Sequence, residues 1–303
     1  PQTQDVGTWC KSGGVINSAG AVATIMAAGV AVDAGGAANM LRLLNEVSPW
    51  LLAIGIVAIA EAYSIGLMLL CRKQWGTDRL ALNNEVAGFK FAVVGVFYAV
   101  LLAFVVIAVW EDYRDTETAV RNEAKALADL HQVSYGLPDE SGTKIRKHLR
   151  VYAQQVHDLE WPAMAHGLGD KATTDELRYL GQALFGGSSN ELKHVALYHH
   201  AIDLMTAIHD NRNERLDSSD GTVPTALWLV LLAGALITLG YPSFFGTSNL
   251  GAQILMTASL AALVALTAFV ALVLDYPFTG DVQISRAPFE QSLQEMPQQE
   301  PPP

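Results

Sequence analysis

The chain has 303 residues, of which 51% are hydrophobic and only 16% are charged, against roughly 25% charged residues in an ordinary soluble domain. This composition excludes a typical water-soluble globule. The formal net charge of −11 also argues against a nucleic-acid partner, because phosphate binding needs clustered basic side chains. Residues 111–220, the most polar part of the chain, carry 12 Lys and Arg against 19 Asp and Glu.

The N-terminal extension, residues 1–49, contains one apolar run at 15–32 that is built mainly from Ala, Gly and Val. The run follows Lys11 and precedes Asp33. Three interpretations stay open at this point. The run is long enough for a fifth membrane span, it resembles an uncleaved signal segment, and it would also suit a helix that lies at the membrane interface.

Four later stretches predict membrane-spanning helices. Each has close to the ~20 apolar residues that an α-helix needs to cross a hydrocarbon layer of ~30 Å. These stretches are residues 50–71, 91–110, 224–245 and 250–274, and Glu61 is the one charged residue in them. We therefore predict an all-α, polytopic membrane protein in which a polar helical bundle is inserted between two pairs of spans. The predicted parts are transmembrane helices 1 and 2 at 50–110, the extramembrane bundle at 111–223, transmembrane helices 3 and 4 at 224–274, and a C-terminal tail at 275–303.

The second predicted span has no helix-breaking residue where it leaves the membrane, because no Gly or Pro occurs between Gly95 and Gly136. A continuous helix of about 45 residues is expected, ~65–70 Å long at ~1.5 Å per residue. Stripes of apolar residues at helical spacing occur in the polar half of this helix and in three later segments, and they predict a helical bundle. The stripes are Tyr113, Val120, Ala124, Leu127 and Leu130; Ile145, Leu149, Tyr152, Val156 and Leu159; Leu177, Leu180 and Leu184; and Val195, Tyr198, Ile202 and Met205. Thr173 and Glu176 have the capping-box spacing of a helix start.

Basic residues in the short connections predict the topology. Residues 72–90 contain Arg72, Lys73, Arg79 and Lys90, whereas the connection at 246–249 has no charge. Because Lys and Arg in short loops favour the cytoplasmic side, the connection at 72–90 is predicted to be cytoplasmic. Residues 1–49, the polar bundle and the C-terminus are then expected on the extracytoplasmic side.

Three groups of residues resemble the bestrophin-like domain family, a widespread group of bacterial membrane proteins. They are Asn84-Glu85-Val86-Ala87-Gly88-Phe89 followed by Gly95-Val96-Phe97-Tyr98-Ala99-Val100 and Trp110-Glu111-Asp112-Tyr113; Glu160-Trp161-Pro162; and Asp275-Tyr276-Pro277-Phe278-Thr279-Gly280. Their order covers about residues 50–296 and leaves residues 1–49 outside the resemblance. The family is named for a faint likeness to bestrophin anion channels. The resemblance therefore implies an integral protein of a bacterial inner membrane with a homo-oligomeric anion pathway.

The resemblance also implies candidate pore residues. Bestrophins are pentamers whose second transmembrane helix lines a narrow apolar neck, and Gly95, Phe97 and Tyr98 match that neck. Phe91 and Phe104 are further aromatic candidates for a constriction that gates by dewetting, although all these rings would equally suit packing against lipid or a helix. Two features depart from bestrophins: Tyr98 and Trp110 are farther apart than the similar pair there, and the bestrophin helical domain is cytosolic. Either departure is compatible with a shared fold that does not conduct.

Glu61 lies in the middle of the first predicted span, where an ionised group costs at least ~2.5–3.5 kcal/mol. In one interpretation it gates or selects ions. In the other it is a protonated carboxyl group that is hydrogen-bonded to the hydroxyl of Tyr63, Ser64 or Tyr98. An ionised Glu would repel a permeant anion, so in an anion pore we expect this residue at a helix seam and not in the lumen.

The sequence contains no nucleophile elbow, P-loop, HExxH or dinucleotide fingerprint, so catalysis is not expected. All eight histidines lie between 131 and 209, outside the predicted spans, and the four at 194, 199, 200 and 209 include no i, i+4 pair. Neither a metal nor another cofactor is therefore expected. Glu160-Trp161-Pro162 is interpreted as a helix stop with a buried indole. Two functions remain: a homo-oligomeric channel for small anions in the lipid bilayer, or a structural or accessory subunit of a larger membrane assembly.

Overall fold

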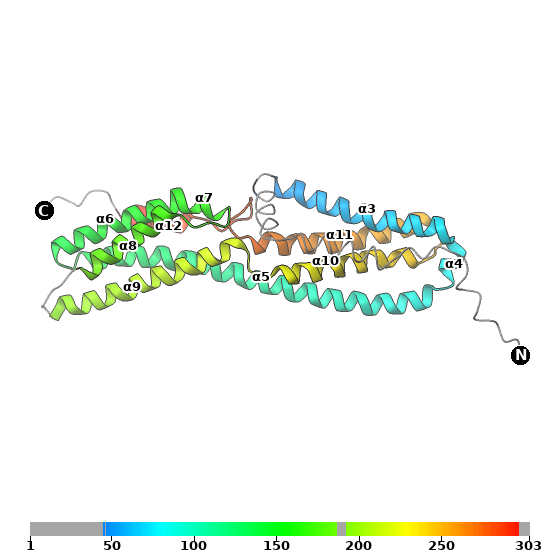
Figure 1. Cartoon of the computed structure of the whole chain (residues 1–303), viewed down its shortest axis with the longest axis horizontal. Helices are drawn as coiled ribbons and strands as arrows, with labels where there is room; N and C mark the ends of the chain where they lie inside the picture. Colours follow the sequence, from blue (N-terminus) through cyan, green and yellow to red (C-terminus); the bar gives the residue numbers. More distant parts are fainter. Residues whose placement is uncertain (1–44, 46, 187–191, 297–303) are drawn as a thin grey trace, which may run out of the picture. The chain divides into compact units, whose positions relative to one another are not determined.

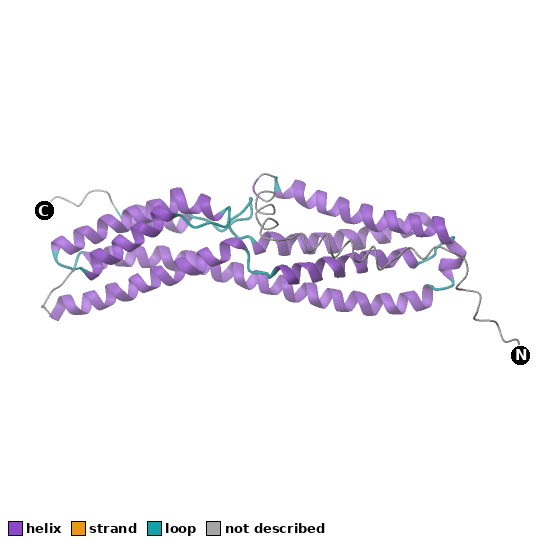
Figure 2. Cartoon of the chain, in the orientation of Figure 1, coloured by secondary structure: helices purple, strands orange, loops and turns teal. Residues whose placement is uncertain are grey.

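The computed structural model describes residues 45, 47–186 and 192–296, and every regular element within these ranges is a helix (Figures 1 and 2). The all-α prediction is thus confirmed for the described residues. The elements are α3 (Pro49–Trp75), α4 (Thr77–Ala81), α5 (Asn84–Ser134), α6 (Asp139–Gln155), the π-turn η2 (Val156–Glu160), α7 (Trp161–Met164), α8 (Lys171–Phe185), α9 (Leu192–Asp217), η3 (Ser218–Asp220), α10 (Thr225–Gly240), η4 (Tyr241–Phe244), α11 (Leu250–Asp275) and α12 (Ala287–Glu295). The apolar run at 15–32 and the end of the tail from 297 lie outside the described residues.

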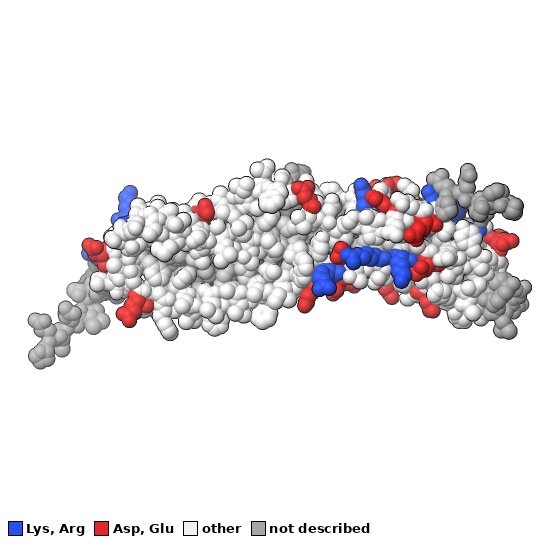
Figure 3. Space-filling model, turned by 180° about the vertical axis from the view of Figure 1, so that it is seen from behind, with Lys and Arg blue, Asp and Glu red and all other residues white. Residues whose placement is uncertain are grey.

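Four stretches are long and apolar enough to cross a membrane, in agreement with the number of spans predicted. They are Pro49–Trp75, Asn84–Ser134, Val195–Phe244 and Leu250–Asp275. The helices α3, α10 and α11 contact one another, and the first half of α5 packs against α10 and α11. We call this group the apolar bundle. Figure 3 shows one face of the molecule, on which charged side chains are scarce over the apolar bundle and frequent elsewhere.

The second half of α5 packs with α6, α9 and α12, and α8 packs against α6 and α9. We call this group the polar bundle. Its core consists largely of the predicted stripes, because residues spaced three and four apart lie on one side of a helix. The buried residues include Val120, Leu127, Leu130, Ile145, Leu149, Tyr152, Val156, Leu177, Leu180, Leu184, Met205 and Ile208. Hydrophobic spacing therefore predicted most of this core.

The helix α5 belongs to both bundles and has 51 residues, which gives a length of ~77 Å at ~1.5 Å per residue. The predicted uninterrupted helix from the apolar segment into the polar segment is confirmed. The helix is longer than expected because it begins at Asn84, seven residues before the uncharged segment, and Gly88 and Gly95 are accommodated within it. One helix thus carries residues of both bundles in a fixed rotational relation.

Two predicted core positions, Leu159 and Val195, are wrong, and a π-turn explains the first. Leu159 was expected to continue the stripe of Tyr152 and Val156, yet its side chain is exposed. The π-turn at Val156–Glu160 accommodates one extra residue per turn, which shifts the register of all following side chains. Glu160 and Trp161 consequently point into the core where Leu159 was expected.

Two further details of the polar bundle differ from expectation. The helix α8 begins at Lys171, and its N-cap is Asp170, whose carboxylate accepts a hydrogen bond of 2.8 Å from the backbone N–H of Thr173. Thr173 therefore lies inside the first turn and is not the N-cap residue. Asp170 takes that role, because its side chain accepts the hydrogen bond from the otherwise unpaired backbone N–H of Thr173. Val195, expected in the core, is exposed in the first turns of α9.

Close packing in the apolar bundle depends on a small residue in α10, Gly234. A Cβ atom at this position would lie only 2.6 Å from Cδ2 of Tyr98 on α5. The seam between α3 and α10 adds two hydrogen bonds, from the hydroxyl of Ser64 to the carbonyl of Leu239 at 2.6 Å and from Tyr63 to the carbonyl of Leu236 at 3.1 Å. These contacts resemble other membrane helix interfaces, where small and hydroxyl residues bring backbones together.

We predict that Gly234→Ala destabilises the apolar bundle, although Ala favours helices more than Gly does. The added methyl group collides with the Tyr98 ring, and overpacking of this kind costs about 1–3 kcal/mol. Thermal unfolding in detergent measures the effect, and Tyr98→Leu combined with Gly234→Ala should recover part of it. Gly66→Ala on α3 is the matched control, because no atom lies within 4 Å of a Cβ there. Equal melting temperatures for the two Ala variants would contradict the close contact.

Candidate functional site

The apolar half of α5 presents one face that is not covered by other described helices. Its exposed members follow helical spacing, and we call them the α5 face: Val93, Val96, Phe97, Val100, Phe104 and Ile107. The two aromatic rings are the most exposed, at 74% for Phe97 and 68% for Phe104. Seven residues separate them, close to two helical turns, so they lie on the same side of the helix. The opposite side of α5 packs against α10 and α11 through Tyr98, Leu102, Val105 and Val109.

The five predicted pore residues therefore separate into two groups. Phe97 and Phe104 lie together on the α5 face, and Gly95 is half-buried with open space beside it. Tyr98 is only 6% exposed because its ring lies against Gly234. Phe91 is half-buried, and its ring packs on Tyr241 and Phe245 with centroid distances of 5.6 and 6.0 Å. A role in lining a pore stays a prediction for all five.

Glu61 lies on α3 and is half-buried. The hydroxyls of Tyr63 and Ser64, which were considered as its partners, donate instead to backbone carbonyls of α10. Within the ranges that the structure describes, Glu61 makes no hydrogen bond or ion pair. Its role, whether in ion selection or in a helix seam, therefore stays a prediction.

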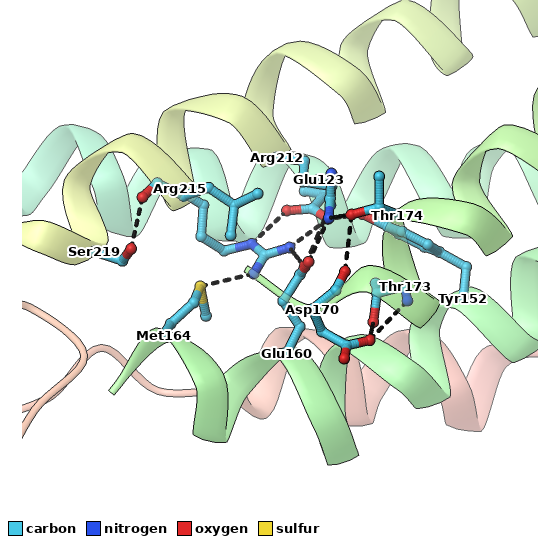
Figure 4. A network of polar contacts seen from close by, with 11 residues as sticks. Glu123, Tyr152, Glu160, Met164, Asp170, Thr173, Thr174, Arg212, Arg215 and Ser219 are labelled. Carbon is cyan, nitrogen blue, oxygen red and sulfur yellow. Dashed lines mark hydrogen bonds and ion pairs between the residues drawn. The ribbon is translucent and has the colours of Figure 1, made fainter. Parts of the chain in front are cut away.

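The polar bundle contains a buried network of two carboxylates and two guanidinium groups, shown in Figure 4. The side chains of Glu123, Glu160 and Arg215 are 0% exposed. Arg215 donates from Nε to Oε2 of Glu123 at 2.7 Å and from Nη2 to Oε2 of Glu160 at 2.7 Å. Arg212 pairs with the same carboxylate of Glu160 through Nη2 and Nε, and its Nη2 also donates to Thr174 at 2.8 Å. The formal charges of the four ionic side chains cancel.

Each member is placed by the local periodicity of its helix. Glu123 lies three residues after Val120 and four before Leu127, on the buried side of α5. Arg212 and Arg215 follow Ile208 by four and seven residues on α9, again on the buried side. Glu160 reaches the same point through the π-turn. The prediction missed this network, although charges within apolar stripes were a visible signal of it.

Tyr152 completes the network from α6, where its hydroxyl donates to Oε1 of Glu123 at 2.6 Å. Complete burial raises the pKa of Tyr152 well above its usual value, and the negative charge of Glu123 raises it further. The hydroxyl therefore stays protonated and remains a donor at physiological pH. Every carboxylate in the network is already paired, so its chemistry is structural: it joins α5, α6, α9 and the π-turn.

The predicted buried indole is confirmed. Trp161 lies between the rings of Phe278 and Phe289, with centroid distances of 5.4 and 5.9 Å, and the guanidinium of Arg215 lies 5.9 Å from its ring. Pro162 occupies the start of the four-residue helix α7, which ends at Met164. The helix stop thus comes slightly later than expected, because Pro is compatible with the first helical turn.

Other residues of the family resemblance stabilise turns. The side-chain amide of Asn84 donates to the carbonyl of Gly246 at 2.7 Å, and its oxygen accepts from the N–H of Gly246 at 2.9 Å. A side chain at Gly246 would lie 2.4 Å from backbone atoms of the α4 segment. The carbonyl of Pro277 accepts from the N–H of Ile284, and Gly280 has a φ of 66°, which favours glycine. Glu85 and Trp110 are exposed, and Trp110 stacks on Tyr113.

Asp275 at the end of α11 holds the chain where it enters α10. Its Oδ1 accepts hydrogen bonds of 3.0 Å from the backbone N–H groups of Thr222 and Val223. Its Oδ2 accepts from the indole N–H of Trp228 at 3.2 Å. The last turn of α11 is thereby tied to the segment that joins the polar and apolar bundles.

Comparison with known proteins agrees with these motifs. Residues 58–289 match the model of the family described as Bestrophin-like domain. None of the curated proteins compared with the chain matches it. The resemblance inferred from the three sequence motifs is therefore confirmed, and the N-terminal extension lies outside the matched residues.

Several solved structures have a similar fold. A bacterial bestrophin homologue from Klebsiella pneumoniae that carries a single mutation is 14% identical, with a TM-score of 0.56 over 80% of this chain and 97% of that chain. A structure of a Klebsiella pneumoniae homologue phased on zinc is 16% identical, with a TM-score of 0.56 over 80% and 96%. A structure described as a membrane protein is 13% identical, with a TM-score of 0.59 over 79% and 97%. At these identities the likeness shows the fold alone.

We predict that Arg215→Met strongly destabilises the polar bundle, because it leaves Glu123 and Glu160 buried beside fewer cations. Removal of one partner from a buried ion pair typically costs about 3–5 kcal/mol. Loss of helical circular dichroism on heating in detergent measures the change. Lys144→Ala is the matched control, because it removes an exposed ion pair with Glu140. A melting temperature for Arg215→Met equal to that of the control would show that the network does not hold the bundle.

Proposed function

Because the chain belongs to the bestrophin-like domain family, we propose that it forms a homo-oligomeric channel for small anions in which α5 surrounds the pore. The α5 face supports this proposal most directly. It is apolar, it is uncovered by the chain's own described helices, and it includes two large aromatic rings. Rings of Phe97 and Phe104 from several copies would form a hydrophobic constriction, which can gate conduction by dewetting. The preference for anions is taken from the family likeness.

Within this proposal the other aromatic candidates act indirectly. Tyr98 packs against Gly234, and Phe91 packs against Tyr241 and Phe245, so both would hold α5 in its rotational position. Gly95 leaves open space beside the helix and would allow close approach of a second copy. The protein would act without catalysis, and its partners would be further copies of itself and the lipid bilayer.

The proposed membrane arrangement keeps the boundaries inferred from the sequence. Residues 50–110 and 224–274 supply two pairs of spans, residues 111–223 form the extramembrane bundle, and residues from 275 return to it. Burial of α12 residues such as Phe289 in the polar core supports the last assignment. We propose a bacterial inner membrane, with the polar bundle on the extracytoplasmic side as the basic connection at 72–90 indicates.

Chloride flux from liposomes tests the channel. The purified chain should form a homo-oligomer and release chloride, and Phe97→Ala with Phe104→Ala should raise the rate several-fold because the apolar constriction widens. Leu255→Ala is the matched control, because Leu255 is equally exposed but lies on α11. Variants at Phe97 and Phe104 that behave like Leu255→Ala would remove α5 from the pore. A monomer in impermeable liposomes, found only with unrelated subunits, would favour the accessory-subunit alternative.

Cysteine labelling from intact cells tests the sidedness. Cys71 is buried, so exposed reporter positions are needed, with Cys10 and Cys71 replaced by Ser. Asp78→Cys reports on the connection at 72–90, and Lys171→Cys reports on the polar bundle, because both residues are exposed. A membrane-impermeant maleimide should label Lys171→Cys in intact cells and Asp78→Cys only after the cells are opened. The reverse pattern would place the polar bundle in the cytosol, as in bestrophins.

A further inference from the structure

A cleft of about 420 Å³ lies between α8 and α9 in the polar bundle. It is remote in sequence from the α5 face, and the proposed conduction does not use it. Its volume falls within the range of about 300–1,000 Å³ that is typical of small-molecule sites. Three of its lining residues carry basic side chains: Arg178, His209 and Arg212. No Asp or Glu is among the described residues that line it.

The two arginine side chains retain donors that no described protein group uses. Arg212 directs Nε and Nη2 to Glu160, and Nη2 also reaches Thr174, but Nη1 makes no hydrogen bond within the part of the chain that the structure describes. Arg178 donates from Nη2 to Asp175 at 2.8 Å, its guanidinium carbon lies 5.1 Å from the centroid of the Tyr179 ring, and its other nitrogens make no hydrogen bond to a described residue. Free guanidinium donors at a cleft favour an anionic ligand, because they bind carboxylates with two parallel hydrogen bonds.

Charge balance favours a ligand with a single negative charge. Glu160 partly neutralises Arg212, and Asp175 partly neutralises Arg178. A dianion such as hydrogen phosphate would add a second charge close to these carboxylates, and the additional repulsion would offset its attraction to the guanidinium groups. A monocarboxylate avoids that repulsion.

The remaining wall is apolar and has room for a hydrophobic body. Leu177 forms part of the floor, and Phe185 lies at the rim with its ring exposed. Gly181 leaves the floor open, because a Cβ there would meet Met205 Cε only at 3.6 Å and Phe185 Cε2 at 3.9 Å, which are ordinary contacts. An added Cβ at this position would therefore meet only side-chain atoms, and no backbone atom of another element, within 4 Å.

We propose that this cleft binds a small organic monocarboxylate whose apolar body lies against Leu177 and Phe185 and whose carboxylate accepts hydrogen bonds from Arg178 and Arg212. Gln182 adds a neutral amide to the lining of the cleft, whereas the hydroxyl of Thr174 already donates to the carbonyl of Asp170. Arg212 also binds Glu160, which pairs with Arg215 in the network that reaches α5. Ligand binding would therefore stabilise the polar bundle. This proposal does not depend on whether the chain conducts ions.

Calorimetric titration of the full chain in lipid nanodiscs with phenylacetate tests the proposal, with a melting-temperature shift as a second readout. Phenylacetamide has the same body without the charge, and we expect it to bind at least about tenfold more weakly because charge-assisted hydrogen bonds are lost. Inorganic phosphate should not compete at equal concentration. Equal binding of the amide, or tighter binding of phosphate, would overturn the proposed ligand class.

Two variants locate the site. Arg178→Gln removes an exposed guanidinium and should weaken phenylacetate binding about tenfold without lowering the melting temperature, because a surface ion pair contributes little to stability. Gly181→Leu should abolish binding by filling the cleft, and its unchanged circular dichroism would show that the fold is intact. Lys171→Gln, also on α8 but outside the cleft, should bind like the wild type. Wild-type affinity in both Arg178→Gln and Gly181→Leu would place any binding elsewhere.

Discussion

The arrangement of the polar bundle depends on one buried cation, the guanidinium of Arg215. A charge without access to water must be paired and hydrogen-bonded nearby, because its desolvation costs several kcal/mol. Arg215 meets this requirement with Glu123 of α5 and Glu160 of the π-turn, so three segments far apart in the chain must meet at one point. Sliding α9 along α5 by one turn would leave these charges unpaired. We therefore attribute the register of the two helices to the ion pairs, because apolar stripes of Leu, Ile and Val tolerate alternative packing.

The same constraint reaches the apolar bundle because α5 is continuous. Tyr98 and Glu123 are 25 residues apart, about seven turns at 3.6 residues per turn, and both lie on the buried side of the helix. Rotation of α5 would withdraw Glu123 from Arg215 in one bundle and drive the Tyr98 ring away from Gly234 in the other. Two independent contacts thus oppose the same motion. Phe97 and Phe104 are directed away from the chain's own described helices as a consequence, and that orientation underlies the proposed pore.

Much of this fold could be predicted from the sequence because hydrophobicity and helix breakers act locally. The spans, the uninterrupted α5 and most of the polar core follow from residue spacing alone. The π-turn could not be predicted, since Val156–Glu160 contains no residue that marks it, and Leu159 was consequently placed in the core. Glu123 and Arg215 stand out as charges within apolar stripes, but their pairing depends on how distant helices meet. Among the pore candidates, Phe97 and Tyr98 were grouped by their shared motif, although adjacent residues on a helix point about 100° apart.

The motifs that identify the family mainly hold the architecture together. Glu160 and Trp161 meet Phe278 around Arg215, although Phe278 follows α11 and lies outside the polar insert that contains the other three residues. Asn84 closes the turn at Gly246, and Asp275 ties the end of α11 to the start of α10. None of these contacts involves the α5 face. Likeness in these motifs therefore indicates a common scaffold. Conduction would depend instead on a short apolar segment of α5, whose side chains do not pair with any buried charge. That segment can vary in ring size and polarity while the scaffold stays unchanged, so relatives with this fold need not share a pore of the same width or selectivity.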